Sequence, residues 1–394
     1  MKFIDPNDFS GSDVEKINTA IRVAAEKSCQ VKISRRRADA ASDRDFWLID
    51  SAILIPGNMT LIVSDCKIKL SNACRDNFIR SANTLDPSVP RIHHLHITGE
   101  GKAVFEGADD PRSTGDAAKI LGERTYGSDA GKAGETPVGD WRNIGILLVK
   151  VADFSIKNIQ VINSHGWAIS LEYCTDGYIG DLAFYSDGVL EINGRKEVTL
   201  NKDGLDLRRG CRNIIIENIS GSTGDDLIAL TAIPTSIRSA GRFGEHEFLG
   251  NSEKLDDEHT YNICIKNVRG YSAGHCNIVR FLNAGGIKMY DITLDGLEDT
   301  SPEKNYCNAT VRVGDTVAAW GGVAPVGDTC NITVKNITSY SKAAIFIGGS
   351  LTDSTFCNVK NFNPEGHNVF YRAGKEYTCN VAFENIELID CKSC

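Results

Sequence analysis

Three carboxylates stand at the starts of two similar segments within residues 201–230, NKDGLDLRRGCRNIIIENISGSTGDDLIAL. Asp203 precedes one alternating apolar run, and Asp225 with Asp226 precedes the next. Aligning the two runs places Asp203 over Asp226, and because neighbouring strands lie about 4.8 Å apart, the three side chains would share one surface. Carboxylates gathered in this way raise one another's pKa and provide an acid beside a base, as general acid–base catalysis requires.

Basic residues of the next two segments fall on the same expected face. In SAGHCNIVRF, matching the strands places His275 level with the carboxylates and turns Arg280 outward. In NATVRVGD, Val311 and Val313 alternate inward and Arg312 outward. Each polar residue alone has an ordinary structural explanation, since Asp before Gly is common in turns and a lone His is often structural. Their convergence on one face favours a functional site.

The elements that must position these residues are predicted by a repeat. An alternating apolar run, then Asn or Asp, then an aliphatic residue recurs at intervals of about 22 to 27 residues, with three longer intervals. This pattern predicts an all-β fold, a right-handed parallel β-helix, forming a single domain over residues 1–394. Asn and Asp suit tight turns because they tolerate left-handed backbone. We expect the eight turn residues to stack along one corner: Asn158, Asp181, Asn218, Asn267, Asp291, Asn336, Asn358 and Asn385.

A helix over residues 12–26 is predicted to cover the open end of the solenoid, within an N-terminal cap over residues 1–30. Ser12 and Glu15 can form a capping box, and a set of apolar residues falls on one helical face, namely Val14, Ile17, Ile21 and Ala24. The enlarged repeat units predict long loops that wall a binding site beside catalytic coils at about 140–350; these loops are residues 185–200, 231–260 and 298–328.

Two smaller motifs have structural interpretations. Four cysteines recur just before the same expected strand and predict a buried thiol ladder: Cys174, Cys211, Cys330 and Cys379. The run Arg35-Arg36-Arg37 is typical of a solvated turn.

Composition narrows the classes of function. The chain of 394 residues is 41% hydrophobic and 24% charged with a net charge of −9, which is typical of a soluble folded protein and argues against nucleic-acid or anionic-membrane partners. The first residues, MKFIDPNDFSGSD, lack the apolar region of a secretion signal. The sequence as printed therefore predicts a cytoplasmic protein, or a secreted one whose signal is absent from this chain, and the compartment and oligomeric state stay open.

Four of the motifs above resemble those of the polygalacturonase-like glycoside hydrolases of family 28, whose core pattern runs N-T-D-G, G-D-D, G-H-G and R-I-K. The resemblance covers about residues 140–350 and includes the upstream run VADFSIKNIQVINSHGWAISLEYC. Here the four motifs read Asn201-Lys202-Asp203-Gly204, Gly224-Asp225-Asp226, Gly274-His275-Cys276 and Arg312-Val313-Gly314. The first two match the family pattern closely, and the last two depart from it.

The resemblance implies an inverting hydrolase of a pectin-like, uronic-acid-containing polysaccharide, with no cofactor and no metal. Asp225 would protonate the glycosidic oxygen, while Asp203 and Asp226 would hold and deprotonate the attacking water. His275 would tune the acid.

Substrate contacts are implied for a further set of residues. The family holds a uronic acid carboxylate with the arginine and lysine of R-I-K, and Gly314 replaces that lysine. Arg280 could restore the lost charge beside Arg312. Lys202 replaces the family's Thr and adds a cation beside the acids, next to Asn201. Trp167 is predicted either to stack on a sugar one coil below Asp203 or to belong to the core.

Two other classes of function remain open on the sequence. A polysaccharide lyase on the same scaffold would need an Arg or Lys base and usually Ca²⁺ bound by acidic residues, and it would leave an unsaturated product. A carbohydrate-binding or structural β-helix would have no activity to lose when an Asp is changed to Asn.

Overall fold

The computed structural model divides into two compact units, which are described separately. The first comprises Met1–Ser170, Cys174–Asn201 and Phe243–Gly250; the second comprises Leu171–Tyr173, Lys202–Arg242 and Asn251–Cys394. Both are built from parallel strands stacked coil upon coil, which confirms the predicted all-β, right-handed parallel β-helix. The structure describes residues 2–40, 42–72, 74, 76–84, 90–109, 144–164, 166–186, 190–192, 195–197, 202–233, 258–283, 285–318 and 321–389.

In the first unit, long strands form one sheet and short strands a second. The long-strand sheet runs through neighbouring parallel pairs of β1 (Phe3–Ile4), β2 (Gln30–Ile33), β5 (Met59–Leu70), β7 (Ile92–Glu106), β9 (Val151–Ile162) and β11 (Thr175–Ser186), with β3 (Trp47–Ile49) also on β5. The short strands β4 (Ile53–Ile55), β6 (Ile79–Ser81) and β8 (Ile146–Val149) pair in that order. A hairpin joins β12 (Leu190–Ile192) to β13 (Arg195–Glu197), and β10 spans Ile169–Glu172.

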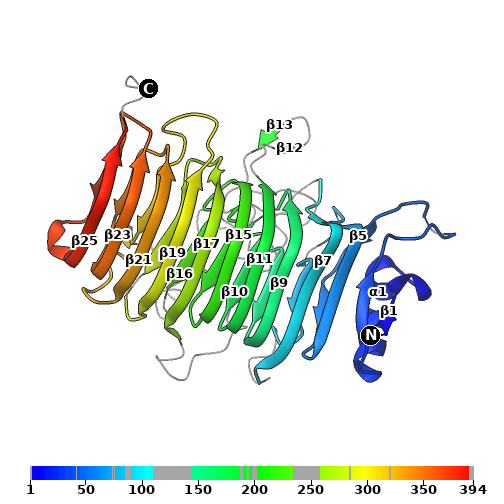
Figure 1. Cartoon of the computed structure of the whole chain (residues 1–394). Helices are drawn as coiled ribbons and strands as arrows, with labels where there is room; N and C mark the ends of the chain where they lie inside the picture. Colours follow the sequence, from blue (N-terminus) through cyan, green and yellow to red (C-terminus); the bar gives the residue numbers. More distant parts are fainter. Residues whose placement is uncertain are drawn as a thin grey trace. The chain divides into compact units, whose positions relative to one another are not determined.

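The second unit repeats this arrangement and carries the predicted site. Its long strands pair in the order β15 (Arg212–Thr223), β17 (Thr260–Ser272), β19 (Met289–Asp299), β21 (Thr329–Ser339), β23 (Leu351–Asn361) and β25 (Thr378–Leu388), side by side in Figure 1. Its short strands pair in the order β14 (Leu205–Arg208), β16 (Ile228–Ala232), β18 (Asn277–Asn283), β20 (Ala309–Val313), β22 (Ala343–Ile347) and β24 (His367–Tyr371). A short helix, η6 (Lys375–Tyr377), precedes β25.

Left-handed residues bend the long strands, as the repeat predicts. All eight Asn and Asp turn positions have positive φ. In the second unit the Asn267 Nδ2 donates to Asn218 Oδ1 at 3.2 Å, and the same bond links Asn385 to Asn358 and Asn358 to Asn336, each at 3.2 Å. Each side-chain amide therefore ties one coil to the next at the same bend.

Asp291 is the exception, and its assignment to this corner is wrong. Asn331 Nδ2 donates to Asp291 Oδ1, which places Asp291 in a second ladder at the other bend of the long strands. The position stacked on Asn267 is Gly296, whose φ is 78°. Both bends need a left-handed residue followed by an apolar one, so the local sequence does not distinguish them.

The predicted capping helix is α1 (Asp13–Glu26), preceded by the short helix η1 (Pro6–Asp8). The Ser12 backbone N–H donates to Glu15 Oε2 at 2.7 Å, which confirms the capping box. The predicted apolar face of α1 is buried and packs beside β1, β2, β3 and β4. Among the described residues, no helix has the length and apolarity that crossing a membrane requires.

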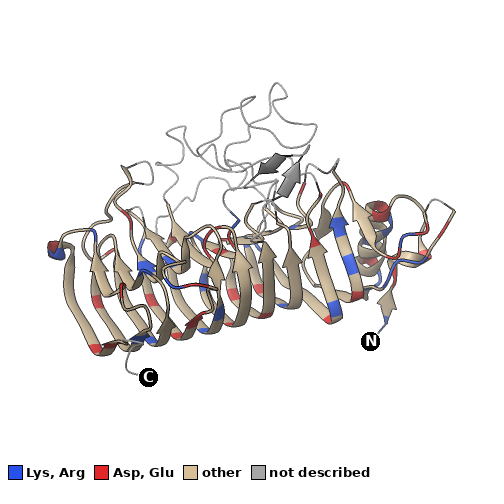
Figure 2. Cartoon of the chain, turned by 90° about the horizontal axis from the view of Figure 1, so that it is seen from above, with Lys and Arg blue, Asp and Glu red and all other residues tan. Residues whose placement is uncertain are grey.

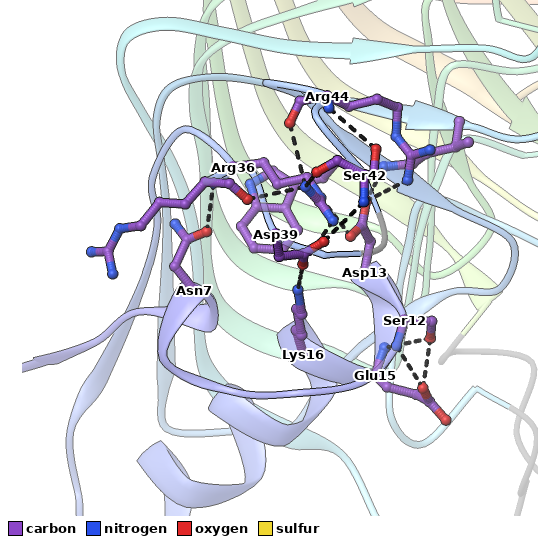
Figure 3. Close-up of polar contacts among 12 residues, drawn as sticks. Asn7, Ser12, Asp13, Glu15, Lys16, Arg36, Asp39, Ser42 and Arg44 are labelled. Carbon is purple, nitrogen blue, oxygen red and sulfur yellow. Dashed lines mark hydrogen bonds and ion pairs between the residues drawn. The ribbon is translucent and has the colours of Figure 1, made fainter.

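Two structural predictions need correction. Arg36 is not in a solvated turn, since it is 5% exposed and its Nε donates to Asp13 Oδ1 at 2.7 Å (Figure 3). Arg35 and Arg37 are exposed. The thiol ladder is also wrong, because the Cys330 and Cys379 rows are separated by Thr352 and Cys379 is exposed. The thiols of Cys174 and Cys211 are buried in their own units.

Candidate active site

The three predicted carboxylates meet at the start of β14 and β16. These strands pair with Leu205 opposite Ile228, so Asp203 and Asp226 each lie two residues before equivalent positions. The Asp226 backbone N–H donates to Asp203 Oδ1 at 2.8 Å and to Asp225 Oδ1 at 3.0 Å. One N–H therefore holds carboxylates from two successive coils, as the alignment of their apolar runs predicts.

A glycine contact fixes the turn above these carboxylates. The backbone of Gly274 lies so close to the preceding coil that a Cβ there would be 1.9 Å from the Gly224 carbonyl oxygen. Any larger side chain would displace this turn from the one that carries Asp225. Thr223 Oγ1 donates to the Asp225 carbonyl at 2.8 Å and secures the lower turn.

Burial and like charge shift the acids toward their protonated forms. Asp203 is 7% exposed, and its removal from water, with the neighbouring carboxylates of Asp206, Asp225 and Asp226, raises its pKa well above the ordinary value. Burial and the Asp226 charge raise the pKa of Asp225 to about 6. The site thus contains a carboxyl group that can donate a proton at mildly acidic pH.

Asp226 differs because donors surround its carboxylate. Its Oδ1 accepts from Asn277 N at 2.9 Å and from Asn277 Nδ2 at 2.7 Å, and its Oδ2 accepts from Arg280 Nη1 at 3.4 Å. Charge-assisted bonds of this kind stabilise an anion. Asp226 is therefore the carboxylate with a cationic partner, and Asp225 the acid with a raised pKa.

Arg280 and Arg312 lie side by side on β18 and β20, as predicted, but they share a partner that sequence reasoning missed. Arg280 Nη2 and Arg312 Nη2 donate to the same oxygen, Asp315 Oδ2, at 2.8 and 2.7 Å. Asp315 is 1% exposed, and its other oxygen accepts from the N–H groups of Thr316 and Val317 at 2.8 and 3.1 Å. The available signal was an Asp one residue after the altered R-I-K motif.

The backbone requires a glycine at position 314, where the motif resemblance leads one to expect a lysine. Its φ is 75°, and a Cβ there would lie 2.5 Å from the Gly349 Cα. A lysine would therefore clash with the next coil. The chain turns at this glycine and brings Asp315 under the two arginines.

His275 lies in the turn over Asp225, in a left-handed conformation with φ 61°, and is exposed. Its Nδ1 is 2.8 Å from the Tyr306 carbonyl oxygen, and its ring packs on Tyr306 with centroids 4.7 Å apart. The thiol of Cys276 interacts with Asp225, and burial together with that carboxylate raises the pKa of Cys276. Tuning of the acid by His275 stays a prediction, and Cys276 is a neighbour of the acid that sequence reasoning missed.

One group of donor atoms in the described part of the chain is compact enough to hold a metal ion. Asp225, Asp226 and Cys276 each offer an atom, and these atoms lie within 4.8 Å of one another. Both oxygens of Asp226 already accept bonds from Asn277 and Arg280.

The remaining predicted residues are only partly placed around these acids. Lys202 is 2% exposed, and its side chain packs under Gly224, where a Cβ would lie 3.0 Å from the Lys202 Cβ. Trp167 is partly exposed and belongs to the first unit. Asn201, half of the predicted loop 185–200 and most of the predicted loop 231–260 lie outside the described residues. The prediction of a loop over 298–328 is wrong in part, because that range contains strand β20 (Ala309–Val313). Substrate contacts by these residues stay predictions.

Comparisons with known proteins show the fold class: a right-handed parallel β-helix like those of polysaccharide-acting proteins. Neither a protein-family model nor a curated protein matches the chain. Among solved structures, an exopolygalacturonase from Thermotoga maritima is similar with 14% identity and a TM-score of 0.56, covering 97% of this chain and 92% of that one. An endo-xylogalacturonan hydrolase from Aspergillus tubingensis has 12% identity and a TM-score of 0.57, covering 99% and 94%.

A tailspike variant of E. coli bacteriophage HK620, in complex with a hexasaccharide, is also similar. Its identity is 12% and its TM-score 0.57, with 98% of this chain and 62% of the tailspike covered. The scaffold of this chain is thus similar to those of an exopolygalacturonase, an endo-xylogalacturonan hydrolase and a phage tailspike. At these identities the likeness concerns the fold, so the function must be argued from the site.

Proposed function

We propose that this protein is an inverting glycoside hydrolase that cleaves a polysaccharide. The observation that supports it most is the convergence of the Asp203 and Asp225 carboxylates on the backbone N–H of Asp226, with both of their pKa values raised and the Asp226 carboxylate paired with Arg280. Cleavage of a glycosidic bond needs one proton donor and one carboxylate that activates water, and this group supplies both.

Asp225 is the general acid in this proposal. With a pKa of about 6 it holds its proton in mildly acidic solution and can pass it to the leaving glycosidic oxygen. Asp226, in contact with Arg280, is the base that takes a proton from the attacking water, and Asp203 helps to hold that water. The water's oxygen forms the new bond to the anomeric carbon as the bond to the leaving oxygen breaks.

The stereochemistry needs a direct measurement because the carboxylates are close. The Oδ1 atoms of Asp203 and Asp225 accept from the same N–H at 2.8 and 3.0 Å. They are therefore nearer to each other than the roughly 6.5 to 9.5 Å usual between the carboxyl groups of inverting enzymes. Inversion is proposed because the motifs of this chain resemble those of the family 28 hydrolases, and a retained anomeric configuration in the product would reject it.

For the substrate we propose a polysaccharide of the pectin type, in which uronic acids occur. Two similar structures are an exopolygalacturonase and an endo-xylogalacturonan hydrolase, which supports this class. The net charge of −9 fits a carbohydrate partner better than a nucleic acid or an anionic membrane. The substrate class is narrowed below by the contacts of Arg280 and Arg312.

The test is an assay of acidic and neutral plant polysaccharides in which new reducing ends are counted and products are followed by NMR. The proposal expects new reducing ends, inverted anomeric configuration in the first product, and no ultraviolet absorbance from unsaturated sugars. An absorbing product would instead identify a lyase. Oligosaccharide binding without any cleavage would identify a carbohydrate-binding protein and reject the enzyme.

A further inference from the structure

The guanidinium groups of Arg280 and Arg312 form a paired cation beside the candidate acids. The two residues are register partners on β18 and β20, and each side chain is 13% exposed. Burial and the neighbouring Arg280 charge lower the pKa of Arg312. Such a pair needs an anion, and a uronic acid carboxylate is the partner expected from the sequence.

That anion is already present in the chain. Asp315 Oδ2 accepts from both arginines at 2.8 and 2.7 Å, while its Oδ1 is anchored by the N–H groups of Thr316 and Val317. A substrate carboxylate could take this place only if Asp315 left two charge-assisted bonds and two backbone bonds. Breaking such bonds costs more than one new contact returns.

The neighbouring charges also disfavour a substrate carboxylate at this position. Arg280 also contacts Asp226, and the field of Asp203 and Asp225 reaches it. An additional carboxylate at this position would join a group already rich in acids. Arg372 adds positive charge near Arg312, but its side chain is exposed to solvent.

Beyond Arg312 the same row of the sheet becomes aromatic. Phe346 is the register partner of Arg312, and its ring lies 4.8 Å below the guanidinium carbon; Phe370 follows with a ring centroid 5.1 Å from that of Phe346. Phe346 is 6% exposed and packs with Ala309 and Ala343, so only the partly exposed ring of Phe370 could contact a sugar. Neither ring offers a hydrogen bond to a carboxylate.

We propose that Asp315 is a specificity-determining residue: it occupies the place of a substrate carboxylate between Arg280 and Arg312, so that the sugar bound there is uncharged. The proposal rests on the proposed carbohydrate-cleaving function and narrows its substrate. In a pectin-type polysaccharide, a neutral sugar rather than a uronic acid would lie over β18 and β20.

The experiment compares an acidic oligosaccharide with its carboxyl-reduced form, which differs only by a hydroxymethyl group in place of each carboxylate. Affinity is measured by calorimetry in the Asp225→Asn background, where binding does not depend on turnover, and kcat/KM is measured in the wild type. The wild-type site is expected to bind the reduced form as well as the acidic form or better. Asp315→Asn keeps the shape but frees a positive charge, so it should raise the acidic-to-reduced affinity ratio about tenfold or more.

Asp299 provides a matched control, because it is a buried carboxylate of the same unit that holds a turn through Ser301 N at 2.9 Å and Ser341 Oγ at 2.6 Å. Asp299→Asn should leave the affinity ratio unchanged. The proposal is overturned if the Asp225→Asn protein with Asp315 intact binds the acidic form tighter than the reduced form, if adding Asp315→Asn leaves the acidic-to-reduced affinity ratio unchanged, or if neither form binds. The affinity ratio measured with Asp315 intact decides even if the Asp315→Asn protein fails to fold. Binding without cleavage would reject only the hydrolase.

Discussion

Two buried groups of charged residues, one in each unit, differ in how their carboxylates are paired. In the first unit, Asp13 accepts from Arg36 Nε at 2.7 Å and from Leu48 N at 2.8 Å, and Asp39 contacts Arg36 and Lys16 (Figure 3). Burial works to lower the pKa of Arg36, and the hydrogen bonds of the two carboxylates raise it above its ordinary value. Asp13, Lys16, Arg36 and Asp39 form an N-terminal cluster that joins α1 to the strand region after it.

In the second unit the carboxylates of the candidate site crowd one another. The Oδ1 atoms of Asp203 and Asp225 share the Asp226 N–H, while the Asp226 carboxylate accepts from Asn277 and Arg280. Asp203 and Asp225 therefore shift toward their protonated forms, whereas the cations and carboxylates of the N-terminal cluster satisfy each other. Carboxyl groups with raised pKa values are frequent at catalytic sites, whereas paired carboxylates are typical of structural contacts.

Exposed ion pairs on the surface differ from both of these buried groups. Figure 2 shows acidic and basic residues on neighbouring strands. Arg269 pairs with Glu298 and Lys335 with Asp295. These side chains are partly or largely exposed, so each pair contributes about 1 kcal/mol or less. Buried clusters are therefore the informative ones.

The largest expected effect separates catalysis from structure. Asp225→Asn removes the proposed proton donor but keeps its shape, so kcat should fall by roughly 10²- to 10⁴-fold while oligosaccharide affinity persists. Initial rates of reducing-end release measure the loss, and calorimetry measures the affinity. Turnover within a few fold of the wild type would remove Asp225 from the role of acid.

In the N-terminal cluster, removal of a carboxylate should lower stability and leave activity unchanged. Asp13→Asn leaves Arg36 buried with only the partly exposed Asp39 as a carboxylate partner, and should lower the free energy of unfolding of the first unit by about 3 to 5 kcal/mol. Urea denaturation measures this, and kcat of the folded fraction should not change. Arg35→Met is the control, since the loss of that exposed side chain should change the stability little. Equal losses in both variants would contradict the distinction between buried and exposed pairs.

A smaller effect concerns pH. The pKa of Asp225 is about 6, and a general acid must be protonated, so kcat/KM should fall about tenfold for each unit of pH above that value. The N-terminal cluster should not contribute, and Asp13→Asn should keep the profile of the wild type. A profile that rises between pH 6 and 8 would show that the essential group acts as a base there.

The sequence predicts the scaffold and the acids well because both follow from strand register. The alternating runs fix Leu205 opposite Ile228, and this pairing alone brings Asp203 to Asp226. The outward direction of Arg280 and Arg312 follows from the same alternation. Contacts between residues at equivalent positions of adjacent coils can therefore be predicted from the sequence.

The missed contacts depend on chain geometry that the repeat does not encode. Asp315 reaches the arginines because Gly314 turns the chain at φ 75°, and Arg36 is buried because α1 places Asp13 beside it from 23 residues away. Asp291 was assigned to the wrong ladder because two bends use the same local signal. In each case the local sequence is compatible with more than one location, and tertiary packing decides between them.

The smallest expected effect is on stability, and it has opposite signs in the two clusters. Asp225 has a folded-state pKa of about 6, against about 3.9 for an unfolded chain. Between those values the folded protein binds more protons than the unfolded one, so this group lowers stability as pH rises through the interval, and the deficit persists above it. Below about pH 4 both states are protonated and the effect vanishes.

Asp225→Asn should therefore stabilise the second unit at pH 7.5, by about 1 to 2 kcal/mol after allowance for partial exposure, and should have no effect on stability below about pH 4. Urea denaturation at the two pH values measures the difference, with Asp13→Asn as the comparison because it should destabilise the first unit at pH 7.5. If Asp225→Asn raises the free energy of unfolding and Asp13→Asn lowers it, then only the charged form of Asp225 destabilises the fold. If Asp225→Asn were instead less stable than the wild type at pH 7.5, Asp225 would be a structural carboxylate like Asp13, and its assignment as the proton donor would lose its electrostatic support.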